Sequence, residues 1–209
     1  MFDWLKKKKA PEVPMAPEVL GLRLGGAFEL DDLKFRLIEP ELTIEGASRT
    51  HMIQAVGEVK LDENTRIVRY YTDDDAFLQV LQHGVNDEDI SEVKLFYFFD
   101  TNAIDTSAQW DDWINNNIVQ PQFELDGETF TKVWDNVVPV AMTENTWSRE
   151  GKVTRTDQFI MLYERQCSED LYESMLVAAE EKISGTHVDR CVVFSTGIDL
   201  TPTDFKLLG

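Results

Sequence analysis

The sequence has few cysteines and no long apolar run. Its two cysteines, Cys167 and Cys191, are too few for a disulfide framework and lack the CxxC spacing of zinc ligands. No segment approaches the roughly 20 consecutive apolar residues that a membrane-spanning helix needs. The first residues also lack the apolar core and cleavage site of a signal peptide. These absences predict a cytoplasmic protein with no transmembrane segment.

Positive charge is also scarce. The 209 residues include 20 Lys and Arg against 39 Asp and Glu, for a formal net charge of -19, and the excess of acid lies entirely beyond residue 20. An acidic body repels polyanions over roughly a Debye length, so nucleic acid is not expected as a partner. A basic protein or a cation would be attracted instead. The alternative, that the excess of acidic residues only maintains solubility, stays open.

Sequence motifs for catalysis and cofactor binding are missing. The segment 193–197 has only the second glycine of a Gly-x-Ser-x-Gly nucleophile elbow. The glycines at 21–26 are not followed by the Lys-Ser/Thr of a phosphate-binding loop. The acidic runs lack the spacing and sixth-position glycine of an EF-hand. We therefore expect no cofactor and no metal site, assign no catalytic residue, and favour a non-enzymatic role.

Two alternatives remain open. One is a hydrolase or ligand-modifying enzyme that uses one of the three histidines, His51, His83 or His187, with a carboxylate from another strand or with the nearby Asp189. The other is weak binding of divalent cations by the acidic loops.

The first twenty residues differ in composition from the rest, and we predict a flexible Lys/Pro-rich leader there. Prolines at every third position from Pro11 to Pro17 favour extended backbone. An apolar tip followed by a lysine run could touch an anionic membrane surface weakly, which would place the protein at the periphery of the inner membrane. The residues of this predicted membrane contact are Phe2, Trp4, Leu5, Lys6, Lys7, Lys8 and Lys9.

Residues 21–209 are predicted to form a single acidic globular domain, with two similar halves at about 21–120 and 121–209 as an alternative. Period-two patterns, β-branched residues and aromatics predict strands. The predicted strands are 33–37, 52–61, 67–71, 77–81, 93–99, 129–134, 137–142, 153–163 and 188–195.

Helical spacing of apolar residues predicts two main helices, at about 106–119 and 169–184. Thr106 or Ser107 would cap the first, and Ser168 the second. The expected fold class is α+β, with a mostly antiparallel or mixed sheet.

Two groups of residues are candidates for partner binding. The acidic run Asp73, Asp74 and Asp75 could attract a basic partner. Trp110 and Trp113 could form an aromatic platform, because tryptophan is enriched at binding hot spots, although a stripe of this kind also fits a core.

The chain resembles the YjfK-like family of bacterial domains of unknown function. The resemblance is carried by the lysine-proline leader, the run 20–27, the step Glu39-Pro40, the triplet 69–71 and the ending 197–202. It implies a genomic neighbourhood with a relative of the phage-shock coiled-coil protein, small membrane proteins and an ATP-grasp ligase. We therefore expect an acidic interaction or adaptor protein that engages a basic or membrane-associated partner, with a role in envelope stress or membrane maintenance.

Overall fold

The computed structural model describes residues 15–185 and 187–208, so most of the leader and its predicted membrane contact lie outside the described residues. Antiparallel strands dominate this part of the chain. The strands are β1 (Ala27–Leu30), β2 (Thr50–Lys60), β3 (Thr65–Thr72), β4 (Ala76–His83), β5 (Ile90–Ala103), β6 (Gln122–Leu125), β7 (Glu128–Lys132), β8 (Val140–Ser148), β9 (Val153–Ser168), β10 (Leu171–Ser184), β11 (His187–Asp199) and β12 (Phe205–Leu208).

Helical segments are short. They are α1 (Asp32–Ile38), η1 (Glu39–Glu41), η2 (Asp87–Asp89), α2 (Ser107–Asp112) and the π-helical η3 (Trp113–Asn117).

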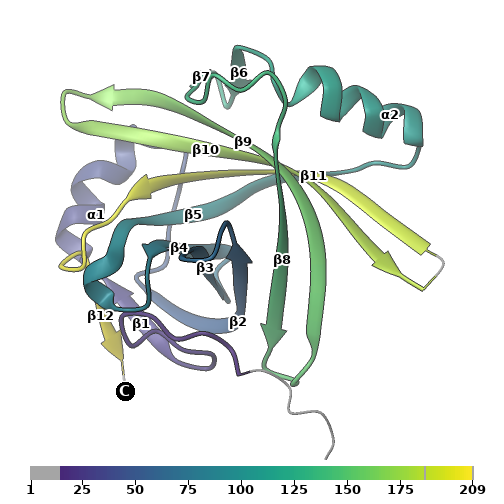
Figure 1. The fold of residues 1–209 in the computed structure, drawn as a ribbon. Helices are drawn as coiled ribbons and strands as arrows, with labels where there is room; N and C mark the ends of the chain where they lie inside the picture. The colour runs from purple at the N-terminus through teal and green to yellow at the C-terminus, as the bar shows by residue number, and fades with distance from the viewer. Residues whose placement is uncertain (1–14, 186, 209) are drawn as a thin grey trace, which may run out of the picture.

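Eight of the strands close into a ring. The hydrogen-bonded order runs β2-β3-β4-β5-β11-β10-β9, and β8 then pairs with both β9 and β2. Figure 1 shows β8 joining the side formed by β9 to the side formed by β2. The remaining strands extend the sheet outward, with β1 and β12 beyond β2, and β7 and β6 beyond β9. Every pairing is antiparallel, so short turns suffice between most neighbours.

Alternation along the strands places apolar residues on both sides of the ring wall. In β3, Val68 and Tyr70 belong to an apolar cluster outside the ring, which β1 and the segment after residue 15 cover. In β9, Met161 and Tyr163 belong to a second outer cluster beneath α2 and the β6–β7 hairpin (Figure 1). Residues between these positions, such as Ile67 and Ile160, face the interior. The wall is therefore buried on both faces over much of its length.

The predicted fold class is wrong. The chain is 58% strand and 12% helical, so it is a β-rich protein and not an α+β protein with two main helices. Eight of the nine predicted strands do fall within observed strands or overlap them. In the first predicted helical segment the chain forms α2 and η3, and the side chain of Thr106 accepts a hydrogen bond from Gln109 N as the N-cap.

The helix predicted at about 169–184 is the strand β10. Its central residues Met175 to Ala179 are buried on both faces, since β9 and β11 pair with it on either side and apolar clusters lie above and below. A continuous apolar run of this kind also contains apolar residues at helical spacing. Without polar residues on one face, the sequence pattern cannot distinguish the two-residue period of a strand from the 3.6-residue period of a helix.

The strand predicted at 33–37 is the helix α1. Asp31 caps it by accepting a hydrogen bond from Lys34 N at 2.8 Å. Phe35 is the buried residue of this helix, while Leu33 and Leu37 are exposed. The alternating pattern misled the prediction because only one of its three apolar residues reaches the core.

Candidate functional site

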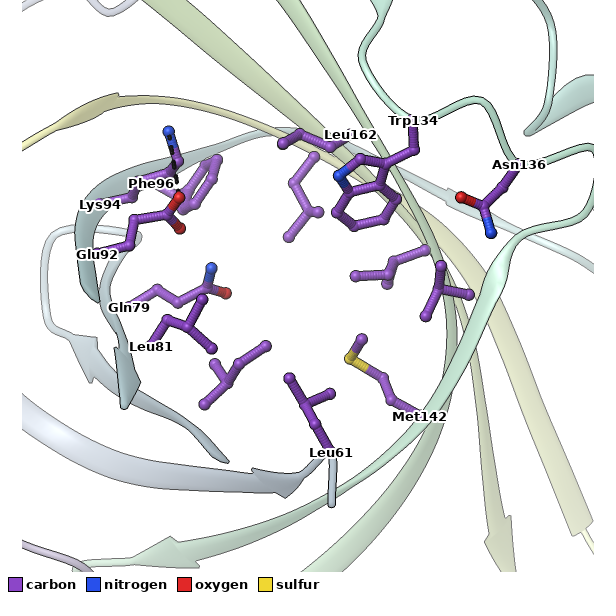
Figure 2. A pocket seen from close by; sticks show the side chains of 14 residues that line it. Leu61, Gln79, Leu81, Glu92, Lys94, Phe96, Trp134, Asn136, Met142 and Leu162 are labelled. Atoms are coloured by element: carbon purple, nitrogen blue, oxygen red, sulfur yellow. Dashed lines mark ion pairs between the residues drawn. The ribbon is translucent and has the colours of Figure 1, made fainter. Parts of the chain in front are cut away.

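The interior of the ring holds a cavity of 410 Å³, which we call the apolar chamber. Figure 2 shows the fourteen side chains that line it. Ten of them are apolar and come from several strands of the ring and the loops between them, among them Leu61 after β2, Phe96 in β5, Met142 in β8 and Leu162 in β9. Trp134, in the loop between β7 and β8, also lines the chamber. The strands thus hold an apolar space open inside the sheet.

Four polar side chains line the same chamber: Gln79, Glu92, Lys94 and Asn136. Lys94 is buried, and its Nζ donates to Asp199 Oδ1 at 2.6 Å and to Ser174 Oγ at 3.3 Å. Glu92 lies 4.0 Å from the same ammonium group. Partial burial raises the pKa of Glu92, and the nearby Asp199 and Glu164 raise it further, against the lowering effect of Lys94.

A buried polar network spans the ring next to this chamber. Arg69 in β3 donates from Nη1 to Glu144 Oε2 in β8 and to Gln158 Oε1 in β9, both at 2.8 Å, and from Nε to Gln79 Oε1 in β4 at 2.9 Å. Tyr71 donates from its hydroxyl to Glu144 Oε1 at 2.8 Å. We call these five residues the Arg69 network. It connects strands on opposite sides of the ring.

The network depends on a glycine in β2. A Cβ at Gly57 would overlap the carboxylate of Glu144, so the absence of a side chain lets Glu144 lie flat against the strand. The pairing of Gly57 with Thr146 brings β8 to this edge. Gly57 therefore belongs to the site by making room for it.

A second cavity of 280 Å³, the polar chamber, lies beyond the network along the same strands. In β8, Val140 and Met142 line the apolar chamber, whereas Glu144 and Thr146 line the polar one. The polar chamber also contains Glu180, which accepts from Gln158 Nε2 at 2.8 Å. Burial raises the pKa of Glu180, and the charge of Glu144 raises it further.

The predicted acidic site is part of a turn. Asp73 accepts a hydrogen bond from Met52 N at 2.8 Å, and Asp74 accepts one from Ser48 N at 2.9 Å. Asp75 has a φ of 48° between β3 and β4. Two of these carboxylates thus hold the start of β2 against the turn, and their role in partner binding stays a prediction.

The two predicted aromatic residues pack against the outside of the ring. Trp110 is buried, and Cζ of Arg190 lies 4.8 Å from the centroid of its ring. Trp113 is partly buried and makes an edge contact with Phe194. The structure brings these two together in one cluster but does not bring them near Asp73, Asp74 and Asp75, which lie on the β3–β4 turn.

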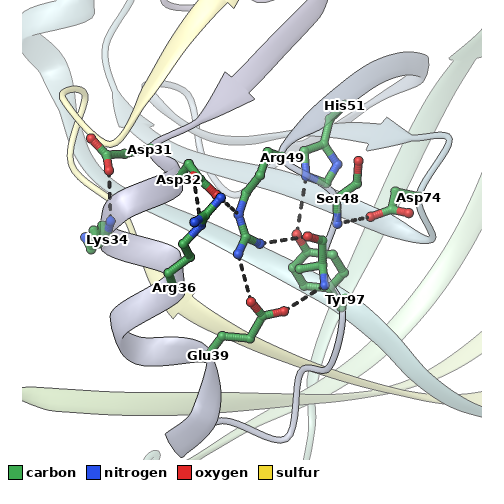
Figure 3. Close-up of polar contacts among 11 residues, drawn as sticks. Asp31, Asp32, Lys34, Arg36, Glu39, Ser48, Arg49, His51, Asp74 and Tyr97 are labelled. Carbon is green, nitrogen blue, oxygen red and sulfur yellow. Dashed lines mark hydrogen bonds and ion pairs between the residues drawn. The ribbon is translucent and has the colours of Figure 1, made fainter.

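The three histidines lie apart. His51 is buried, stacks on Phe28 and contacts Thr72 Oγ1 at 3.3 Å. Its Nε2 also lies 3.3 Å from the hydroxyl of Tyr97 (Figure 3). Burial lowers its pKa. His83 is exposed and contacts Thr65 Oγ1, and His187 is exposed with Nε2 2.9 Å from Asp189 Oδ1. None of the three lines either chamber.

Within residues 15–185 and 187–208, no three His, Cys, Asp or Glu side chains are arranged to hold a metal ion. No helix there has the length and apolarity that crossing a membrane requires.

Neither of the two chambers nor the Arg69 network is predicted by the sequence patterns. The alternation Ile67-Arg69-Tyr71 was a usable signal, since it places an arginine on an otherwise apolar face of a strand. A charge at such a position needs a partner, but its partner Glu144 is 75 residues away in the chain. Nothing local identifies that residue.

The fold and the site together define a class: an antiparallel β protein whose sheet closes around an apolar cavity beside a buried ion-paired network. The chain belongs to the family described as protein of unknown function (DUF2491), whose model matches residues 1–206. It is 30% identical over 211 residues to the uncharacterized protein YjfK of Escherichia coli strain K12, and the match covers 97% of this chain and 95% of that protein. No solved structure matches the chain significantly. The YjfK-like resemblance is thereby confirmed, and so is bacterial origin.

Proposed function

We propose that this protein is a non-enzymatic binding protein that holds a small, mainly apolar molecule in the apolar chamber. The observation that carries the proposal is the chamber itself, with 410 Å³ of space and ten apolar side chains around it. Ligand sites in proteins are typically concave spaces of roughly 300–1,000 Å³, mostly apolar with a few polar groups that orient the ligand.

Packing supports the same interpretation. Protein interiors are close-packed, and voids larger than a water molecule are few. Side chains around a space of this size give up contacts that a filled core would make. A ligand that fills the apolar chamber would restore those contacts.

The loop 133–139 contributes both to the wall of the apolar chamber and to the exposed surface. It carries Trp134, which lines the apolar chamber (Figure 2), and then Val137 and Val138, whose exposed fractions are 82% and 61%. Because Asn136 and Val140, on either side of these valines in the chain, line the chamber, the two exposed side chains would give an entering apolar ligand its first contacts.

The test is binding of a neutral apolar dye, N-phenyl-1-naphthylamine, followed by fluorescence. We expect saturable binding at one dye per chain. Met142→Trp adds bulk inside the chamber and should weaken binding at least about tenfold, a change of about 1.4 kcal/mol.

Met52→Trp is the matched control, because Met52 is an exposed methionine outside the chamber. Equal binding by wild type and Met142→Trp would rule out the chamber as the site. Absence of any saturable binding would count against the proposal as a whole.

The other functions expected from the sequence are supported less well than ligand binding or stay predictions. Docking of a basic or membrane-associated partner by the acidic surface stays a prediction, as does a role in envelope stress or membrane maintenance. For the enzymatic alternative, the histidine within reach of a carboxylate is His187 beside Asp189, and both side chains are exposed. For the cation alternative, the described residues contribute no cluster of three ligands. The chamber therefore supports ligand binding better than either.

A further inference from the structure

We propose that the molecule in the apolar chamber carries a cationic amine and that this amine pairs with Glu92. The inference rests on the proposed binding function and names the chemical class of its ligand. It follows from which charged groups in the chamber wall are already neutralised and which are not.

Lys94 cannot serve as the receptor for an anionic ligand. Its ammonium group is buried and already contacts Asp199 at 2.6 Å, with Glu164 at 3.9 Å and Glu92 at 4.0 Å. One ammonium thus stands among three carboxylates. A carboxylate ligand placed beside them would meet net repulsion.

Glu92 has the opposite properties. Among the described residues no group donates a hydrogen bond to its carboxylate, and its ion pair with Lys94, at 4.0 Å, is the longest of the ion pairs of that ammonium. The side chain is 38% exposed, so it is neither fully solvated nor fully paired. An ammonium group on a ligand would supply a closer, hydrogen-bonded partner than Lys94 does at 4.0 Å.

The position of Glu92 fits a molecule with one charged end. Figure 2 shows Glu92 and Lys94 together on one side of the chamber, with Met142 and Asn136 on the far side. An amine at Glu92 would therefore leave the apolar body of the ligand against Phe96, Leu162 and Met142. The chemical class is an amphiphilic amine, with a chain or ring system that the chamber encloses.

Three eight-carbon probes distinguish the alternatives: n-octylamine, 1-octanol and octanoate. Each is titrated against the bound neutral dye at 0.15 M salt, which shortens the range of bulk electrostatics to about 8 Å. We expect octylamine to displace the dye about tenfold more effectively than octanol, and octanoate to be the weakest.

The variant Glu92→Gln should lower the affinity for octylamine about tenfold and leave that for octanol unchanged, which also shows that the variant is folded. Glu88→Gln is the matched control, since it removes the same charge from an exposed position in η2. It should leave all three affinities unchanged.

The outcomes separate the two proposals. If octanol displaces the dye as well as octylamine does, the amine inference fails and the binding function stands. Equal losses of octylamine affinity in Glu92→Gln and Glu88→Gln would also overturn it, since they would show attraction by the general acidic surface. If none of the probes and no dye binds, the binding function itself fails.

Discussion

At the residue scale, the Arg69 network is the most demanding feature of the interior. Arg69 and Glu144 are both almost fully buried, with exposed side-chain fractions of 3% and 2%. A buried charge is tolerated only when it is paired and hydrogen-bonded. Nη2 of Arg69 has no hydrogen-bond partner among the described residues, and the guanidinium group lies over the ring of Phe77 with Cζ 5.5 Å from its centroid. The network therefore leaves little tolerance for the loss of any member.

We expect Arg69→Met to destabilise the protein by about 3–5 kcal/mol, because removal of one partner leaves the charge of Glu144 buried and unpaired. Urea unfolding followed by fluorescence measures the change in the free energy of unfolding. The matched control is Arg66→Met in the same strand, where the ion pair with Glu58 is partly exposed and should contribute only about 1 kcal/mol or less. Similar losses in the two variants would contradict the importance assigned to burial.

At the element scale, β10 shows that pairing with neighbouring strands can make a segment extended although its apolar residues have helical spacing. Leu171, Met175, Leu176, Ala179 and Ile183 lie at helical spacing, yet the chain here is extended from Leu171 to Ser184. Adjacent residues point to opposite sides of the strand, with Val177 in an outer cluster and Leu176 in the ring interior. Hydrogen bonds on both edges satisfy the backbone without a helix.

Native-state hydrogen exchange tests this assignment. The amides of Met175 to Ala179 should be among the slowest in the protein and exchange only by global unfolding, because they are buried and paired on both sides. Amides of α1 serve as the internal comparison and should exchange faster, since that helix has Phe35 as its buried anchor. Exchange of β10 at the rate of α1 would show that the central strand is not part of the stable core.

At the scale of the whole molecule, the net charge of -19 opposes compaction. Ion pairs such as Arg49 with Glu39, shown in Figure 3, offset part of the repulsion locally but cannot balance the excess of acid. Stability should therefore depend on ionic strength more than in a neutral protein of this size.

We expect an increase from about 0.01 M to 0.5 M NaCl to stabilise the protein by on the order of 1 kcal/mol, because screening weakens the repulsion among carboxylates. For a chain of this length that corresponds to a rise in Tm of about 2–4 °C. Tetramethylammonium chloride is the control and should have a similar effect if screening is general. A fall in Tm, or a response to sodium alone, would contradict this account.

The local features of this protein could be predicted from its amino-acid sequence. β-branched and aromatic residues in segments such as 67–71 identified strands, and charge counting identified the acidic body. Thr106 or Ser107 was the predicted cap of the first helix, and Thr106 caps α2. These features depend on neighbouring residues, so local chemistry is enough to reveal them.

Closure of the sheet into a ring around the two chambers is a consequence of long-range strand pairing. Closure depends on β8 pairing with β2, and the network across the ring joins Arg69 to a residue 75 positions away. A strand with apolar residues on both faces carries no mark of which face will meet a core and which will meet a cavity. That distinction arises from the pairing of distant strands, which no local pattern encodes.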